Sequence, residues 1–163
     1  EKLYEASQAG VKIELIVRGI CVLIPGIPGV SDNITVRSIV GRFLEHSRIF
    51  WFRNGGREEL YISSADWMPR NLNDRVELMV PIEDPEIKRR LKQMVDIELS
   101  DNQKAHIMQA DGTWLKTISA ENQLCAQEYF QKIAEKRDAE DEMTLAQKLE
   151  PYTPVLGHGD GSD

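Results

Sequence analysis

Apolar and polar positions along the chain predict helices that alternate with strands. Residues 11–17, 34–40 and 74–82 are short runs rich in β-branched side chains, a composition typical of strands. Residues 1–9 read as the end of a helix, and apolar residues recur at helical spacing over residues 87–99. Helices between buried strands indicate an α/β fold, with a mixed sheet flanked by helices.

Two turn signals predict β-hairpins. Asn54-Gly55-Gly56 tolerates positive φ and separates an extended stretch, residues 46–52, from a returning stretch, residues 59–62. Asp111-Gly112 lies in the same way between residues 105–108 and 113–116. Because turns of this kind join antiparallel neighbours, each signal predicts a pair of adjacent strands.

The first hairpin carries the clearest candidate chemistry. His46 and Arg48 are separated by one residue, so an extended strand points both side chains to one face. The returning strand leads to Ser63, Ser64 and Asp66, which we expect near the same end of the hairpin. Imidazole can exchange a proton with a phosphate, and a guanidinium can bind two phosphate oxygens without losing its charge. A solvated or hydrogen-bonded surface pair is the more usual explanation of such spacing, and the residues alone leave both readings open.

Arg18 is a second candidate. It follows the predicted strand at residues 11–17 and precedes Gly19. Open α/β sheets bind ligands at the carboxyl ends of their strands, and glycine lets a ligand approach the backbone. A salt bridge at the strand end is the alternative for Arg18, and the residues favour neither.

Length and composition indicate one globular domain with a core: the chain has 163 residues, 41% of them hydrophobic. It begins with Glu1 inside a predicted helix, so we expect a piece of a longer protein. No apolar run reaches the length of a membrane span, and the net charge of −7 argues against a broadly basic surface for nucleic acid. Cys21 and Cys125 belong to no CxxC or His/Cys cluster, which predicts reduced thiols and no metal site.

The carboxy-terminal part differs in composition from the rest. Residues 120–147 are charged and alanine-rich with a weak apolar stripe, which predicts a helix. Residues 151–163 contain Pro151, Pro154 and the run GHGDGSD, and we expect a disordered tail that includes His158. The sequence thus predicts one domain over residues 1–150 and a tail.

Three stretches resemble a known family: EHSRIFWFRNGG, YISSADWMPRN and LIVRGICVLIPGIPGVSDNITVRSIVGRFLEH. They are similar to the carboxy-terminal catalytic domain of the polyphosphate kinases, over residues 1 to about 112 and more loosely beyond. The resemblance implies a phospholipase D-like domain. Phospholipase D patterns have His-x-Lys, a downstream Asp and then Gly-Ser-x-Asn; here Arg48 replaces Lys, Arg53 replaces that Asp and Asp66 replaces Asn. These departures count against a phosphodiesterase and agree with the kinase subgroup.

The resemblance implies a reaction as well. Polyphosphate kinases move the terminal phosphate of ATP reversibly onto polyphosphate through a phosphohistidine. That histidine and the Mg²⁺ ligands belong to a preceding domain that is absent here, so we expect no turnover from this chain alone. By its match His46 is the general acid/base, and Arg18 contacts the nucleotide phosphates. The full set of expected nucleotide- and phosphate-binding residues is Arg18, His46, Arg48, Ser64, Asp66, Arg70 and Asn71.

Partners and rival functions follow from the same resemblance. It implies the remaining domains of the same polypeptide, ATP or ADP, polyphosphate, a homo-oligomeric full-length enzyme and no nucleic acid. It also implies a cytoplasmic location, with membrane association of the full-length enzyme left open. One rival is a phospholipase D-like phosphodiesterase that pairs two His46 half-sites in a dimer. The other is a phosphate-binding or assembly module without catalysis.

Overall fold

The computed structural model describes the backbone of residues 1–148 and the side chains of residues 1–138. The expected disordered tail at residues 151–163, with His158, lies outside the described residues. The chain divides into two compact units, Glu1–Gln127 and Glu128–Asp163, and every candidate site residue lies in the first.

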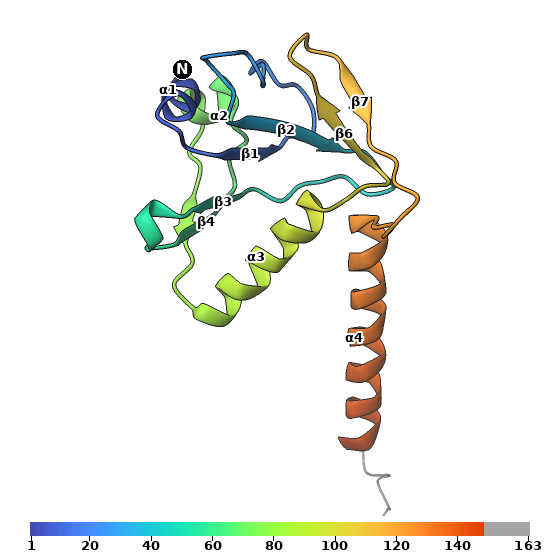
Figure 1. Ribbon diagram of the computed structural model, residues 1–163. Helices are drawn as coiled ribbons and strands as arrows, with labels where there is room; N and C mark the ends of the chain where they lie inside the picture. The colour runs from blue at the N-terminus through green and yellow to red at the C-terminus, as the bar shows by residue number, and fades with distance from the viewer. Residues whose placement is uncertain (149–163) are drawn as a thin grey trace, which may run out of the picture. The chain divides into compact units, whose positions relative to one another are not determined.

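The first unit contains two sheets (Figure 1). In the four-stranded sheet β1 runs parallel to β2, whereas β2, β6 and β7 pair antiparallel. The three-stranded sheet is antiparallel throughout. In spatial order the first sheet is β1 (Ile13–Ile16), β2 (Ile34–Ile39), β6 (Ala105–Met108) and β7 (Trp114–Lys116), and the second is β3 (Ile49–Phe52), β4 (Glu59–Ser63) and β5 (Met79–Pro81). The predicted α/β class is confirmed, but the expected single mixed sheet is divided in two.

The core of the first sheet follows from the alternation along β2. Ile34 and Val36 point to one face and are fully buried, and Met108 of β6 joins them. Helix α1 (Lys2–Gln8) packs Leu3 and Tyr4 against this cluster. Because β1 and β2 are anchored by this core, the segment that follows β1 leaves a fixed sheet edge.

The predicted hairpin around Asn54-Gly55-Gly56 is confirmed, with positive φ at all three residues. Strand β3 begins at Ile49, whereas the extended stretch was predicted to begin at residue 46. Its partner β4 ends at Ser63. The Ser63 N–H donates to the Arg48 carbonyl at 2.9 Å, which is the last hydrogen bond at this end of the hairpin. Residues 46–48 therefore lead into the sheet without belonging to a strand.

Helix α2 (Pro69–Asp74) was not predicted. The strand expected at residues 74–82 is present only as Met79–Pro81. Proline is favoured in the first turn of a helix, so Pro69 marks the start of α2. The side chain of Ser64 accepts a hydrogen bond from the N–H of Leu78 at 3.0 Å. Together with the hydrogen bond from the Ser64 N–H to the Leu78 carbonyl at 3.0 Å, that contact holds the chain just before β5 against the end of β4.

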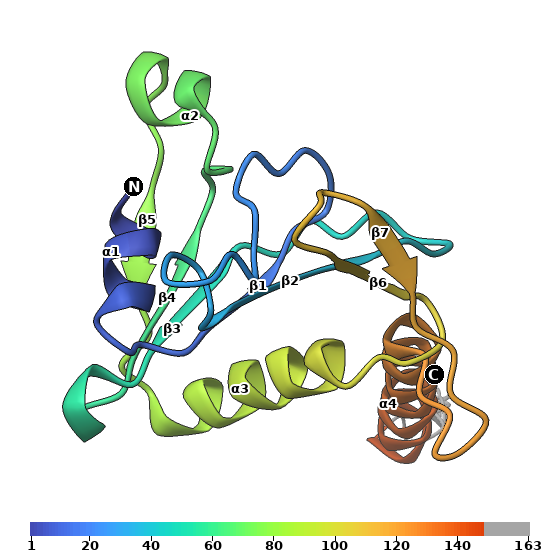
Figure 2. The same cartoon turned by 45° about the horizontal axis from the view of Figure 1, so that its top comes forward.

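Helix α3 (Pro85–Leu99) agrees with its prediction and supports the second sheet. The Asp84 carboxylate accepts hydrogen bonds from the first free N–H groups of α3 and so fixes where the helix begins. In both Figure 1 and Figure 2, α3 runs below the β1–β2 pair. Lys92 joins α3 to the hairpin by an ion pair with Glu58 at 2.9 Å and by lying 4.5 Å from the centre of the Trp51 ring.

Helix α4 (Ala126–Lys148) begins six residues later than predicted. The buried Asp101 carboxylate accepts a hydrogen bond from the Ala126 N–H at 2.8 Å, which fixes the first residue of the helix. Asn102 holds the preceding loop by accepting from the Leu124 N–H at 2.9 Å. Within the described part of the chain, no helix combines the length and apolar character needed to cross a bilayer.

Candidate active site

Asp66 lies between two arginines that come from different sheets. Its Oδ1 atom is 2.9 Å from Nε of Arg48, which precedes β3, and its Oδ2 atom is 3.6 Å from Nη2 of Arg18, which follows β1. Arg18 is also tied to the other segment, since its Nη1 donates to the Glu45 carbonyl at 2.8 Å. The structure thus brings together the strand-end arginine and the hairpin residues that the sequence suggested separately.

The charges of this cluster keep Asp66 ionised. The hydrogen bond from Arg48 lowers the pKa of the Asp66 carboxyl, and the charges of Arg48, Arg18 and a protonated His46 lower it further. Two guanidinium groups therefore face one carboxylate, and the cluster keeps an excess of positive charge. Arg18 and Asp66 are partly exposed, with side-chain exposures of 36% and 27%, so an anion from solvent can reach them.

His46 is exposed beside Arg48. Nη1 of Arg48 is 3.4 Å from Nδ1 of the imidazole, and Nη2 is 3.3 Å from Nε2. The lone-pair directions of the two ring nitrogens diverge in the ring plane, so one guanidinium cannot donate along both. At least one ring nitrogen consequently keeps a direction along which it can exchange a proton with a bound ligand.

Ser64 and Asn71 meet a different carboxylate. The Ser64 hydroxyl donates to Glu77 Oε2, and the Asn71 amide, which is 3% exposed, donates to Glu77 Oε1 at 2.9 Å. These two hydrogen bonds lower the pKa of Glu77. Sequence reasoning did not include Glu77, because its position within the strand predicted at residues 74–82 gave no sign of a partner. Arg70 lies exposed on α2, with no ion pair among the described residues.

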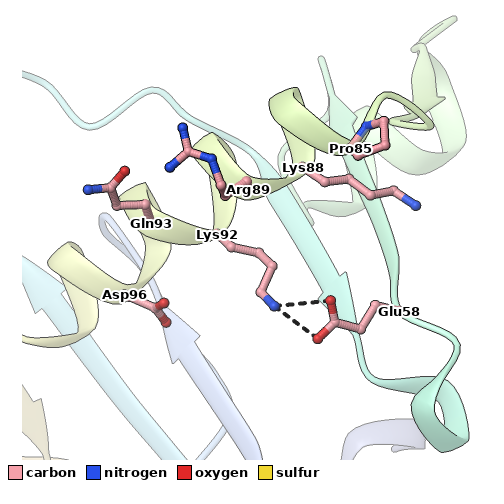
Figure 3. Close-up of a pocket in the computed structure, with 7 residues that line it drawn as sticks. All are labelled: Glu58, Pro85, Lys88, Arg89, Lys92, Gln93 and Asp96. Atoms are coloured by element: carbon pink, nitrogen blue, oxygen red, sulfur yellow. Dashed lines mark hydrogen bonds and ion pairs between the residues drawn. The ribbon is translucent and has the colours of Figure 1, made fainter.

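A separate hollow of about 560 Å³ lies beside α3 (Figure 3). Basic side chains of α3 and the Glu58 carboxylate line it, and Lys92 points to Glu58 across it. None of the residues around His46 contributes to its lining. The hollow is therefore a feature of the α3–hairpin contact and not part of the candidate site.

The donor set at the candidate site does not fit a Mg²⁺ ion. Among the described residues no three His, Cys, Asp or Glu side chains come together as metal ligands. The Asp66 carboxylate is held by two arginines, whose charges oppose a cation there. No step of the chemistry is assigned to a metal held by these residues.

Comparison with known proteins decides the family. The model for "Polyphosphate kinase C-terminal domain 2" matches residues 1–127. The chain belongs to the polyphosphate kinase family. The polyphosphate kinase of Pseudomonas aeruginosa is 58% identical over 121 residues, which are 74% of this chain and 18% of that protein. The polyphosphate kinase of Staphylococcus haemolyticus is 52% identical over 147 residues, 90% of this chain and 20% of that protein.

A solved polyphosphate kinase has the same fold. The crystal structure of the enzyme from Porphyromonas gingivalis matches with a TM-score of 0.79 and 43% identity, over 85% of this chain and 22% of that one. The resemblance stated from the sequence is thereby confirmed, as is the fold class. The chain spans only about a fifth of the length of these polyphosphate kinases.

Proposed function

We propose that this chain forms one side of the phosphoryl-transfer site of a polyphosphate kinase that moves the terminal phosphate of ATP reversibly onto polyphosphate. The observation that carries the proposal is the convergence of Arg18, Arg48 and Asp66 beside an exposed His46. An excess of fixed positive charge next to a titratable ring is the arrangement that phosphoryl transfer requires, because charge on the phosphate oxygens must be neutralised while protons move.

His46 acts as general acid/base in this proposal. In the first step the bond from the terminal phosphorus to the ADP oxygen breaks while a bond forms to a histidine nitrogen of a preceding domain. In the second step that phosphorus–nitrogen bond breaks, and a terminal oxygen of polyphosphate takes the phosphoryl group. The His46 ring takes the proton from that entering oxygen and returns it in the reverse direction.

Arg18 and Arg48 bind the phosphate oxygens, and Asp66 orients both guanidinium groups before the substrate arrives. Each arginine keeps donors that Asp66 does not use, which can reach two phosphate oxygens at once. Arg70, exposed on α2, is proposed as a further phosphate contact. Ser64 and Asn71 would act through Glu77, because binding phosphate directly would break their hydrogen bonds to it.

The whole enzyme completes this arrangement. ATP or ADP and polyphosphate are its proposed substrates, and Mg²⁺ is held by ligands outside this chain. The remaining domains of the polypeptide carry the phosphohistidine, in a homo-oligomer located in the cytoplasm. The isolated 163-residue chain is therefore expected to bind polyphosphate weakly and to have no turnover.

The test compares full-length enzyme variants in the synthesis of labelled polyphosphate from ATP. Loss of one contact to a charged phosphate costs about 1.5 to 3 kcal/mol, so Arg18→Ala should lower kcat/KM at least about tenfold. His46→Gln should abolish most synthesis, whereas Glu83→Gln, an exposed change elsewhere, should have no effect. Normal synthesis by His46→Gln would favour the non-catalytic module, and cleavage of a chromogenic phosphodiester by the isolated chain would favour the phosphodiesterase.

A further inference from the structure

A glutamine far along the chain holds the segment that carries His46. Gln127 is the second residue of α4 and is 6% exposed. Its amide pairs with the backbone of Phe43 in both directions: Oε1 accepts from the Phe43 N–H at 3.0 Å, and Nε2 donates to the Phe43 carbonyl at 2.8 Å. The same Nε2 donates to the Glu45 carboxylate at 2.6 Å. One amide thus makes three hydrogen bonds to residues that precede His46 by at most three positions.

Gly41 packs closely against the Gln127 amide. A Cβ atom at this position would lie 2.3 Å from Oε1 of Gln127 and 2.8 Å from its Cδ. Real Cβ atoms do not approach that closely, so residue 41 has to be glycine while Gln127 keeps its position. The backbone of residues 41–45 is therefore seated directly against the amide.

Other contacts to this segment are few. Within the described residues, the backbone of residues 41–47 makes no hydrogen bond to another backbone group. The contacts that fix it come from side chains: the Gln127 amide at Phe43 and the Arg18 guanidinium at the Glu45 carbonyl. Gln127 is itself well anchored, because the buried Asp101 carboxylate binds the N–H of Ala126 beside it.

We propose that Gln127 is a positioning residue for His46, and that Gly41 is glycine because it receives the Gln127 amide. Arg18 and Gln127 hold the segment from two sides, so the imidazole keeps its place relative to Arg48 and Asp66. The proposal rests on the acid/base role of His46 proposed above. Misplacing a reacting group by about 1 Å can lower a rate by two orders of magnitude, so a clamp of this kind matters to turnover more than to substrate binding.

The first experiment measures kcat and KM for ATP in the full-length enzyme. Gln127→Met keeps the length of the side chain and removes all three hydrogen bonds. It should lower kcat at least about tenfold and change KM for ATP less than about twofold, because the phosphate-binding arginines stay in place. The matched control is Gln131→Met, one helical turn further along α4. Among the described residues, the Gln131 amide has a hydrogen bond only to Glu135, and its change should leave kcat unaltered.

Two more variants test the contact itself. Gly41→Ala should lower kcat by displacing the Gln127 amide, and adding it to Gln127→Ala should cause no further loss, because the clamp is then already gone. Gln127→Glu keeps an acceptor for Phe43 but donates a hydrogen bond only when protonated. The kcat of Gln127→Glu, relative to that of the wild type, should therefore rise about threefold or more as the pH falls from 8 to 6.

The outcomes separate this inference from the function it rests on. If His46→Gln is inactive while Gln127→Met and Gly41→Ala turn over normally, the clamp is wrong and the proposed function stands. If His46→Gln is active, the proposed function itself fails. Should Gln127→Met not fold, the pH dependence of Gln127→Glu decides, and a ratio that stays constant with pH would overturn the clamp.

Discussion

The buried acid Glu98 makes the stability of the chain depend on pH near neutrality. Glu98 lies on α3 with 8% of its surface exposed. Burial raises the pKa of its carboxyl to about 7, and the negative charge of Glu45 raises it in the same direction. The perturbation that tests this is Glu98→Gln, which has nearly the shape of the protonated acid and cannot ionise.

The magnitude follows from the pKa values of the folded and unfolded chain. The ordinary value for the carboxyl is 4.5 and the folded value is about 7. At about 1.4 kcal/mol per pH unit, the difference between the two pKa values corresponds to a contribution of about 3 kcal/mol to the free energy of unfolding. The folded state holds the proton more tightly, so this stability is present below pH 4.5, is lost as the pH rises to about 7 and stays lost above it.

The assay is urea unfolding of the 163-residue chain and of Glu98→Gln between pH 5 and pH 8. The variant should exceed the free energy of unfolding of the wild type by about 1 kcal/mol at pH 5 and by about 3 kcal/mol at pH 8. Glu86→Gln is the control, because the hydrogen bond from Arg89 lowers the pKa of that exposed glutamate and its replacement brings no gain at high pH. An advantage of Glu98→Gln that is equal at every pH would refute the reasoning.

Three further changes test other contacts of the first unit. Asp66→Asn removes the carboxylate that neutralises the two arginines, and it should tighten binding of tripolyphosphate to the 163-residue chain about threefold or more at low salt, by calorimetry. Lys92→Ala removes the ion pair with Glu58 and should lower the free energy of unfolding by about 1 kcal/mol, measured in urea. Ser64→Ala removes a donor to Glu77 and should lower the free energy of unfolding in the same assay, with less loss in acid, where that carboxylate is protonated.

Local signals predicted the parts of the fold that depend on few residues. The hairpin around Asn54-Gly55-Gly56 is set by backbone conformations that these residues tolerate, and the structure has it. His46 and Arg48 lie side by side, as expected from their spacing, although both residues precede β3. Helix α2 was missed because Pro69 was its only local sign, and the six residues of the helix are too few for an apolar periodicity. The division into two sheets depends on pairing between distant segments, and no local pattern reports that.

The candidate site shows the same limit. Arg18 was placed at a sheet edge by a general rule of α/β folds, but its partner Asp66 is 48 positions away and only the tertiary structure brings them together. Gln127 gave no signal, because it is one amide in a charged helical sequence and its partner Phe43 is 84 positions away. Long-range pairs of polar groups carry no periodicity, so the residues that orient a site are harder to predict than those that carry its charge.

The distribution of charge agrees with the proposed role of this chain, which is to bind and orient phosphate groups. Its net charge is −7, yet the two arginines around Asp66 leave a local excess of positive charge beside His46. In the proposed function, a polyanion is attracted to this cluster although the molecule as a whole carries net negative charge. Under the same proposal the nucleophile and the metal come from other parts of the polypeptide; the cluster itself contains one imidazole and, among the described residues, no group of metal ligands. The proposed function therefore depends more on precise placement of His46 than on affinity, because the ring has to meet groups carried by another part of the enzyme.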